Sequence, residues 1–376
     1  QAFRGVVYQV AALLVIALAG AYLMSNTLEN MRARGIKSGF DFLLQPAGFG
    51  IGESLFEFDS AQSYGVAYLV GLSNTLRVAL VGIVAATVLG TLIGVGRLSR
   101  NLLVRGLCSA YVEVTRNIPL LLQLFMWYFV MTELLPPVEN PLHPFPHAFF
   151  SKNGLQFPIP AWVPGHWGTI AGLVAGAIGA WFWTRVARQR REATGKALPV
   201  LIPTLLVVIA GGLIGWLAGG MPVGLNLPEK TEINVVGGGS VTPEYLTMLI
   251  GLTVYTAGYI AEVVRAGIQS VPYGQHEAAA SLGLSRWQQL RLVQLPQALR
   301  VIIPPMTSQY LNLTKNSSLA VAVGYPDLVS ISATSLNQTG RAIECIAVVM
   351  ACYLTLSLLT SAAMNLYNRR VRLKDR

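Results

Sequence analysis

Apolar residues gather in eight long stretches along this chain, and shorter polar segments separate them. Each stretch is roughly 18 to 25 residues long, which is the length that an α-helix needs to cross the hydrocarbon core of a bilayer. The pattern therefore predicts an all-α polytopic membrane protein with about eight transmembrane helices. The predicted spans are Val6–Met24, Thr75–Val95, Asn117–Leu135, Gly168–Val186, Leu198–Ala218, Tyr245–Val264, Val301–Val323 and Ile343–Tyr367.

The composition agrees with this prediction. Of the 376 residues, 53% are apolar and 12% are charged, whereas soluble domains average about 25% charged residues. The cysteines Cys108, Cys345 and Cys352 lack the spacing of metal ligands, and we interpret them as packing residues. The chain begins at Gln1 without a methionine, so we expect part of the native N-terminus to be missing. We interpret the first apolar stretch as a retained helix, because no small-residue cleavage pattern follows it.

Basic residues are concentrated in alternate loops between the predicted spans. If both termini are cytoplasmic, the inner segments hold most of the lysines and arginines, which is the usual bias of membrane proteins. The inner residues are Arg4; Arg97, Arg100, Arg105 and Arg116; Arg185, Arg188, Arg190, Arg191 and Lys196; Arg265, Arg286, Arg291 and Arg300; and Arg369, Arg370, Arg372, Lys374 and Arg376. The outer loops hold Arg32, Arg34, Lys37, Lys152 and Lys230.

The seventh predicted span, Val301–Val323, is unusually polar, and its Pro304 and Pro305 are expected to bend the helix. Polar groups are costly in hydrocarbon, so this helix should face a partner helix or a wet pathway. Two interpretations stay open: hydrogen bonds to a zwitterionic substrate in a translocation pathway, or hydrogen bonds between helices without substrate contact. The candidate pathway residues are Gln309, Asn312, Lys315, Asn316 and Ser317.

Glu262, in the sixth predicted span, is the main acidic candidate for the pathway. Its carboxylate could bind the α-amino group of a substrate. Arg265 lies three residues further on, on the same helical face, and could neutralise Glu262 instead. Lys315 has a similar ambiguity, because it could meet a substrate carboxylate or reach water at the outer end of its span.

A helix–turn–helix pattern follows the sixth span. Ala278 and Ala279 give a helix surface with little side-chain bulk, so another protein could approach it closely. Gly283 permits a tight turn. Ser285 can cap the next helix, and Pro296 lacks the N–H group needed to continue it.

The charged residues of this segment have more than one interpretation. Glu277 could cap a helix or pair with a basic residue. Arg286 could pair with acidic groups on a partner or anchor the loop at the inner membrane surface. The segment also has the form of a DNA-binding helix–turn–helix, and the net charge of +10 would suit nucleic acid. We favour protein docking, because the flanking segments are membrane spans and the charges follow the predicted topology.

Residues 277–296 resemble the EAA loop of importer-type ABC permeases, with Val293 in the usual isoleucine position. That loop docks into a groove on the ATP-hydrolysing subunit. The resemblance gives an ATPase-coupling role to Glu277, Ala278, Ala279, Gly283, Arg286, Leu295 and Pro296. Residues 73–77 (SNTLR), 111–125 (YVEVTRNIPLLLQLF), 258–268 (GYIAEVVRAGI) and 315–319 (KNSSL) are similar to the bacterial polar amino-acid uptake permeases of the histidine/glutamine/arginine type.

The resemblance implies the type I ABC importer fold, whose five-helix core would come from the second, third, sixth, seventh and eighth spans. The first span and the hairpin of the fourth and fifth are additions, as in the longer permeases of the general L-amino-acid importer of Gram-negative bacteria. The expected domains are 1–64, an N-terminal helix and periplasmic loop; 65–135, the first part of the core; 136–243, inserted loops and hairpin; and 244–376, the second part, with the coupling loop at 270–298.

The family also implies a location and partners. We expect a permease subunit in the bacterial inner membrane that moves L-amino acids from periplasm to cytoplasm. Its partners would be two ATP-binding subunits, a related but non-identical permease and a periplasmic amino-acid-binding protein, with lipid around it and no nucleic acid. The outer loops at 136–167 and 219–243 are candidates for contact with the binding protein.

We expect no catalytic residue, cofactor or metal in this chain. The sequence has no G-x-x-x-x-G-K-[ST] phosphate loop, so ATP and magnesium would be held by separate subunits. Two other functions stay open. An ion-coupled secondary amino-acid transporter would act without an ATPase but leaves the EAA loop unexplained. A membrane scaffold or receptor subunit leaves the polarity of the seventh span unexplained.

Overall fold

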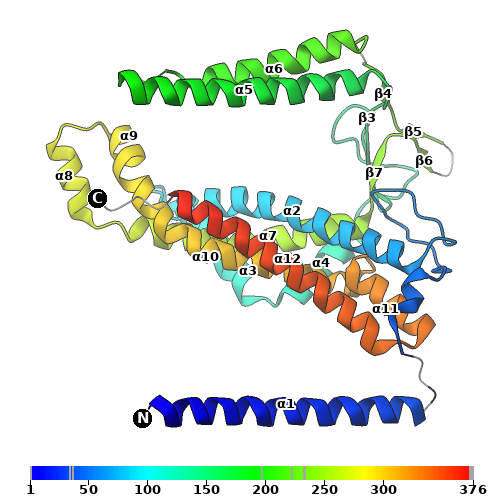
Figure 1. Cartoon of the computed structure of the whole chain (residues 1–376). Coiled ribbons are helices and arrows are strands. Elements are labelled where there is room, and N and C mark those ends of the chain that lie inside the picture. The colour runs from blue at the N-terminus through cyan, green and yellow to red at the C-terminus, as the bar shows by residue number, and fades with distance from the viewer. Residues whose placement is uncertain are drawn as a thin grey trace. The chain divides into compact units, whose positions relative to one another are not determined.

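The structure is a computed structural model that describes residues 2–33, 35, 38–195, 198–221, 223–231 and 234–371. Helices dominate it (Figure 1). They are α1 (Ala2–Ala33), α2 (Tyr64–Gly96), α3 (Leu102–Asn117), α4 (Leu120–Phe129), α5 (His166–Thr194), α6 (Leu201–Ala218), α7 (Pro243–Gln269), α8 (Tyr273–Ser281), α9 (Arg286–Gln288), α10 (Leu295–Asn316), α11 (Leu328–Thr339) and α12 (Ala342–Val371). Of the basic residues used to predict orientation, Arg34, Lys37, Lys196, Arg372, Lys374 and Arg376 lie outside the described residues.

Six described helices are long and apolar enough to cross a membrane, and the number rises to eight if each of two bent helix pairs forms one span. The bent pairs are Leu102–Asn117 with Leu120–Leu134, at 106°, and Arg286–Val323 with Leu328–Thr339, at 50°. The predicted all-α polytopic class is therefore confirmed, with a span number in the predicted range.

The third predicted span differs from a single straight helix. Asn117 was expected to begin it, but α3 ends at Asn117 and α4 begins at Leu120 after a sharp break. Ile118 is extended because the ring of Pro119 disfavours helical backbone in the residue before it. The side chain of Asn101 caps the start of α3 by accepting hydrogen bonds from the backbone N–H groups of Leu103 and Val104.

The seventh predicted span ends at Val323, as expected, but its last residues are not α-helical. The α-helical backbone of α10 continues through both internal prolines, and a 3-10 turn, η4 (Ser317–Val323), extends it. Gly324, at φ 77°, ends this turn in the left-handed region. Asp327 then caps α11, with its side chain accepting a hydrogen bond from the N–H of Ser330 at 2.8 Å. The sequence analysis did not predict α11, since this short helix is rich in serine and threonine.

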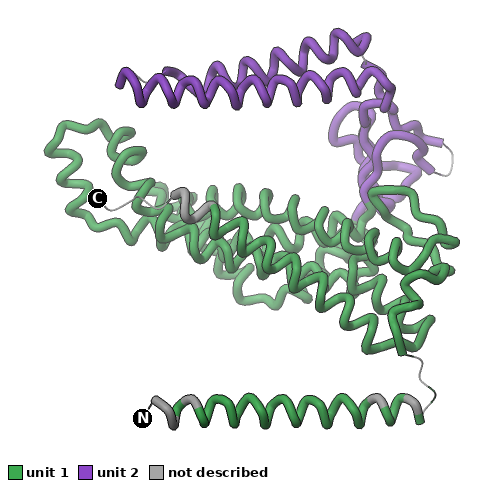
Figure 2. Tube along the Cα trace, viewed as in Figure 1, with its two compact units in different colours: residues 1–134, 242–376 green, residues 135–241 purple. Residues whose placement is uncertain are grey.

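The chain divides into two compact units, residues 1–134 with 242–376 and residues 135–241 (Figure 2). In the first unit, α7 is central, with α2, α3, α4 and α10 packed against it. In the apolar stretch of α7, 61% is buried, against 33% in the apolar stretch of α2 and 11% in that of α12. The outer helices therefore leave most of their apolar surface for lipid or for other subunits.

Glycines on α2 let it approach α7 closely. A Cβ atom on Gly90 would lie 2.7 Å from the Cβ atom of Ile260, and one on Gly94 would lie 2.7 Å from the carbonyl oxygen of Ala261. Real Cβ atoms do not approach other atoms so closely, so these two positions require glycine for this packing.

The segment between α1 and α2 belongs to the fold of the first unit. Phe42, in the short helix η1 (Phe40–Leu44), is fully buried in a cluster with residues of α2 and α11. The guanidinium of Arg341 pairs with Asp41 at 2.5 Å, and the Glu344 carboxylate accepts a hydrogen bond from the N–H of Gly39 at 2.7 Å. This segment is thereby fixed to the junction of α11 and α12.

The second unit holds short strands that the sequence analysis read as loops. Strands β1 (Phe149–Ser151), β2 (Gly154–Phe157) and β7 (Gly239–Val241) form an antiparallel sheet in the order β1-β2-β7. Two further ribbons pair β3 (Ile159–Pro160) with β4 (Leu225–Asn226) and β5 (Glu229–Lys230) with β6 (Val235–Val236). The loops on either side of the α5–α6 hairpin are thus joined by main-chain hydrogen bonds.

The α5–α6 hairpin is packed through glycines on both helices. A Cβ atom on Gly172 would lie 2.2 Å from the carbonyl oxygen of Gly211, and one on Gly215 would lie 2.2 Å from that of Gly168. The two backbones therefore touch directly, as in membrane helix pairs with small residues at their interface.

We predict that Gly90→Ala lowers the stability of the protein by about 1–3 kcal/mol, because the added methyl group overpacks the α2–α7 interface. The thermal unfolding midpoint of the purified protein in detergent measures this effect. Gly106→Ala on α3 is the matched control, since a Cβ atom there meets nothing within 4 Å. An unchanged midpoint for Gly90→Ala would contradict the described packing.

Candidate coupling and transport sites

The predicted coupling segment folds as a helix, a turn and a second helix after α7. Helix α8 carries Glu277, Ala278 and Ala279; Ala279 is buried, whereas Ala278 and Glu277 face solvent. The turn contains Gly283 at φ 73°, a conformation that residues with a Cβ atom rarely adopt. The described structure gives the Glu277 carboxylate no ion pair or hydrogen bond, so neither expected intramolecular role is seen.

The second helix begins with a capping box. The Ser285 side chain accepts a hydrogen bond from the N–H of Gln288, and the Gln288 side chain accepts one from the N–H of Ser285 at 2.9 Å. The capping role predicted for Ser285 is therefore confirmed. Helical backbone then continues through the π-helical turn η3 (Gln289–Gln294) into α10.

The expectation that Pro296 ends a helix is wrong. Pro296 follows Leu295 in the first turn of α10, directly after the π-helical turn. Proline is tolerated in the first turn of an α-helical segment, where its missing N–H group is not required. Proline here marks a change of helical hydrogen-bonding pattern instead of a helix end.

Side-chain contacts hold the coupling segment together. A ring nitrogen of His276 lies 2.5 Å from the side-chain amide of Gln294, and the amide of Gln297 donates to that of Gln275 at 3.2 Å. These bonds tie α8 to η3 and α10. The segment also exposes large apolar side chains, with Leu282 at 79% and Trp287 at 66%. An exposed apolar surface on an internally fixed loop is typical of a docking site for another protein.

Glu262 lies at the centre of a cluster of arginines. The cluster is near the C-terminal end of α7, which leads into the coupling segment. The Glu262 carboxylate pairs with Arg265 on the same helix and with Arg97 at the end of α2, and Arg116 of α3 lies 4.0 Å away. The ion pair with Arg265 considered in the sequence analysis is present. Binding of a substrate amino group to Glu262 stays a prediction, and it would require displacing these guanidinium groups.

Helix α10 presents its polar residues on more than one side. Ser308, Asn312 and Lys315 are exposed and spaced by four and three residues, so they share one face. Gln309 and Asn316 lie beside this face and are half-buried. The opposite side of α10 is apolar and packs against the core of the unit. An exposed polar face on a membrane helix requires a wet pathway or another subunit against it.

Ser317 differs from the other pathway candidates because it is buried. Its hydroxyl donates to the carbonyl oxygen of Thr314 at 2.7 Å and lies 3.4 Å from the hydroxyl of Tyr353 on α12. The structure therefore gives Ser317 a helix-packing role. A substrate contact for this residue remains untested.

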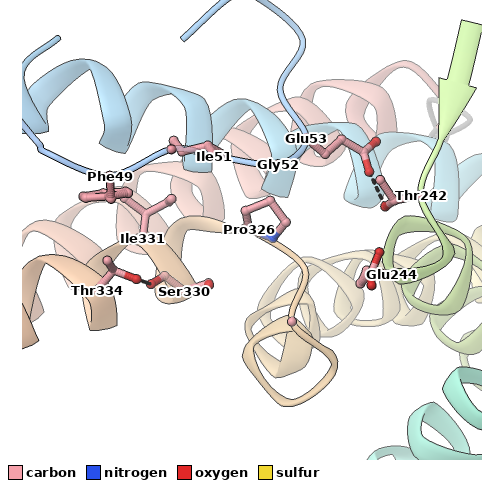
Figure 3. Close-up of a pocket in the computed structure, with 12 residues that line it drawn as sticks. Phe49, Ile51, Gly52, Glu53, Thr242, Glu244, Pro326, Ser330, Ile331 and Thr334 are labelled. Carbon is pink, nitrogen blue, oxygen red and sulfur yellow. Dashed lines mark hydrogen bonds between the residues drawn. The ribbon is translucent and has the colours of Figure 1, made fainter. Parts of the chain in front are cut away.

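A polar cleft of about 420 Å³ lies at the opposite end of α7 from the coupling segment (Figure 3). Glu53 reaches it from the segment before α2, and its carboxylate accepts a hydrogen bond from Thr242 and pairs with Arg77. Glu244 lies on the other side of Pro326 from Ser330 and Thr334. The Asn74 amide donates to the carbonyl oxygens of Glu53 and Pro326, at 2.8 and 2.9 Å. These bonds hold two of the residues that line the cleft in place.

Comparison with known proteins places the chain in a family. The model of the family described as binding-protein-dependent transport system inner membrane component matches residues 193–373. The general L-amino acid transport system permease protein AapQ of Rhizobium johnstonii is 43% identical over 375 residues, covering 100% of this chain and 94% of that protein. The chain belongs to this family.

A second sequence relative and a solved structure were also found. The putative amino-acid ABC transporter permease protein YhdX of Escherichia coli K12 is 44% identical over 377 residues, covering 99% of this chain and 95% of that protein. A crystal structure of an amino acid ABC transporter with histidines matches 82% of this chain and 95% of its own, at 20% identity and a TM-score of 0.48. The predicted kinship with amino-acid ABC permeases is confirmed by the sequence relatives.

The sequence analysis missed the ion pairs that the fold forms between residues far apart in the sequence. Arg97 and Arg116 were noted as inner basic residues, and Arg77 only within the stretch 73–77, without any partner. Their partners Glu262 and Glu53 lie on other segments. One signal was present, because a carboxylate and a guanidinium in or beside apolar stretches must each find a partner.

We predict that Glu262→Gln destabilises the protein by about 1–3 kcal/mol, because Arg97 and Arg265 lose the carboxylate that they share. The thermal unfolding midpoint in detergent measures the effect. Glu192→Gln is the control, since it removes a carboxylate from an exposed pair with Arg188, whose side chain is 82% accessible, and should change nothing measurable. Equal midpoints for the Glu262 variant and wild type would contradict the structural role of the cluster.

Proposed function

We propose that this chain is the transmembrane permease subunit of an ATP-driven ABC importer that moves L-amino acids from the periplasm to the cytoplasm. The observation that carries this proposal is the coupling segment at 270–298. It combines a small-residue helix face with exposed apolar side chains, and it directly follows the central helix α7. The names of the full-length relatives support the amino-acid substrate class.

Force applied to the coupling segment would reach the core through two helices. The segment connects α7 to α10, and these helices pack against each other. Because hydrogen bonds tie α8 to η3 and α10, a docked ATPase subunit would move the segment as one body. Displacing α10 would move its polar face and so change the access of the pathway from one side of the membrane to the other.

The proposed assembly contains two ATP-binding subunits, a related but non-identical permease and a periplasmic amino-acid-binding protein. ATP and magnesium belong to the ATP-binding subunits, and no catalytic step is assigned to this chain. The exposed polar face of α10 supports a second permease, since lipid would not cover that face well. The bias of basic residues supports cytoplasmic termini in a bacterial inner membrane.

The functional division of the chain follows the same proposal. Residues 1–64 add an N-terminal helix and periplasmic loop, 65–135 and 244–376 form the permease core, and 136–243 are an insertion. The strand-joined loops at 136–167 and 219–243 are the proposed contact surface for the binding protein.

We predict that Gly283→Val uncouples the importer, because valine is strained at a φ of 73° and would rearrange the turn of the coupling segment. The complex is purified with its ATPase subunits and reconstituted in lipid, and ATP hydrolysis is measured with and without the loaded binding protein. The stimulated rate should fall about tenfold or more, as one lost docking contact of about 1.4 kcal/mol would give.

Gly274→Ala on α8 is the control for this experiment, because its Cβ atom meets nothing within 4 Å and its backbone has no positive φ. It should couple as wild type does. Failure of any ATPase subunit to purify with the wild-type chain would refute the importer and favour a transporter that acts alone.

We predict that Gln309→Leu and Asn316→Leu on α10 reduce uptake of labelled amino acids into proteoliposomes while the complex still assembles. Both substitutions remove hydrogen-bonding groups beside the exposed polar face and keep a similar volume. Val301→Leu, on the exposed apolar part of the same helix, is the control and should transport normally. Normal uptake by both leucine variants at positions 309 and 316 would exclude these residues from the pathway.

A further inference from the structure

A small polar cavity lies where the broken third span meets α7. Its volume is about 230 Å³, and it is lined by Val112, Glu113, Arg116, Asn117 and Tyr259. The lining holds a carboxylate, a guanidinium, an amide and a phenol, with one aliphatic side chain. This set offers both charges that a zwitterion requires within a space the size of one small molecule.

Arg116 retains hydrogen-bond donors for an additional anion. The two carboxylate oxygens of Glu262 are already engaged by Arg97 and Arg265. Arg116 lies 4.0 Å from that carboxylate, which is beyond hydrogen-bond distance, and its side chain is 42% exposed. Its guanidinium packs over the ring of Tyr259, with 5.3 Å to the ring centre. This packing orients the guanidinium without using its N–H groups.

Glu113 supplies the opposite charge on the same helix face. It lies three residues before Arg116 on α3, which places the two Cβ atoms about 5–6 Å apart. The described structure gives the Glu113 side chain no ion pair or hydrogen bond, and the residue is exposed. The charged groups that line the cavity are Glu113 and Arg116, so a ligand with no net charge leaves their balance unchanged.

The break between α3 and α4 is a built feature beside this cavity. Asn117 lines the cavity and is the last residue of α3, and the two helices meet at 106°. The side-chain amide of Gln123 donates to the carbonyl oxygens of Thr115 and Ile118, at 2.8 and 2.9 Å. These bonds satisfy the carbonyl groups that the break leaves open. Broken helices in transporters commonly line ligand sites in this way.

We propose that this cavity binds the zwitterionic backbone of an amino acid, with the α-carboxylate at Arg116 and the α-ammonium at Glu113. The inference rests on the proposed function and names a substrate site within it, separate from the polar face of α10. Both charged partners contact groups that every amino acid shares. Val112, Asn117 and Tyr259 remain to contact a side chain, and none of them is charged, so the site accepts side chains of different chemistry.

The site lies on the half of α7 that leads into the coupling segment, because Tyr259 and Glu262 fall in the second half of Pro243–Gln269. In the proposed orientation this is the cytoplasmic half. A substrate bound here therefore lies on the cytoplasmic side of the cleft at Glu53 and Glu244.

The test measures direct binding to the whole complex. The permease, its partner permease and the ATPase subunits are placed in nanodiscs without nucleotide, and binding of tritiated L-glutamine is followed by scintillation proximity. Arg116→Gln and Glu113→Gln should each weaken binding about 10- to 100-fold, as expected for the loss of a charge-assisted hydrogen bond. Unlabelled glutamine should compete, whereas N-acetyl-glutamine and 4-aminobutanamide should not.

Arg105→Gln is the matched control, because this arginine also lies on α3 but does not line the cavity. It should bind as wild type does. Glu113→Gln removes no contact described in the structure, so it keeps the test decisive if Arg116→Gln fails to fold, which its thermal unfolding midpoint reveals.

Wild-type affinity in both cavity variants, or equal weakening in Arg105→Gln, would overturn the site. The same purified complexes are also reconstituted in proteoliposomes, and uptake is measured there to separate the two levels of the proposal. If wild-type complexes import amino acids and the cavity variants bind glutamine normally, only this site is wrong. If wild-type complexes neither bind nor import any amino acid, the proposed function fails and the site fails with it.

Discussion

The close contact between α2 and α7 is the constraint on which the rest of this permease depends. Gly90 and Gly94 allow the two backbones to meet. Helix α2 ends at Gly96, two residues after Gly94, and Arg97, which follows directly, pairs with the Glu262 carboxylate of α7. Helix α7, held in this way, sets the position of the coupling segment that follows it. A bulkier contact would move Arg97 away from the Glu262 carboxylate.

Features that depend on neighbouring residues could be predicted from the sequence. The long apolar stretches gave most of the spans, and Gly283 and Ser285 were correctly assigned to a turn and a cap because both roles are local. Features that depend on distant partners could not. Helix α11 and the short strands have little apolar periodicity. The helix continues through Pro296 because a π-helical segment precedes it, and no residue pattern predicts that segment. The Glu262 cluster joins three helices, so only the tertiary fold assembles it.

The segment between α1 and α2 contributes more to the core than a connecting loop would. Phe42 is buried beside α2 and α11, and Asp41 pairs with Arg341. Glu53 reaches further, to Arg77 on α2 and Thr242 at the start of α7. The ends of α2, α7 and α12 opposite the coupling segment are thus held by residues that precede the core in the sequence. Removing this segment would remove Glu53 and with it one wall of the cleft at Glu244.

The glycine contact within the α5–α6 hairpin makes the packing of these two helices depend on their backbones. Gly172, Gly211 and Gly215 bring the backbones of α5 and α6 into direct contact. The two helices therefore pack against each other through their own residues. Strand β2 precedes the hairpin and strand β7 follows it, and the two strands are paired. The segments that lead into and out of the hairpin therefore run side by side. The paired strands therefore let the chain carry two additional helices while its two connecting segments stay together. A side chain at these glycines would push the two backbones apart, whereas a change at an exposed residue of the hairpin would leave this contact intact.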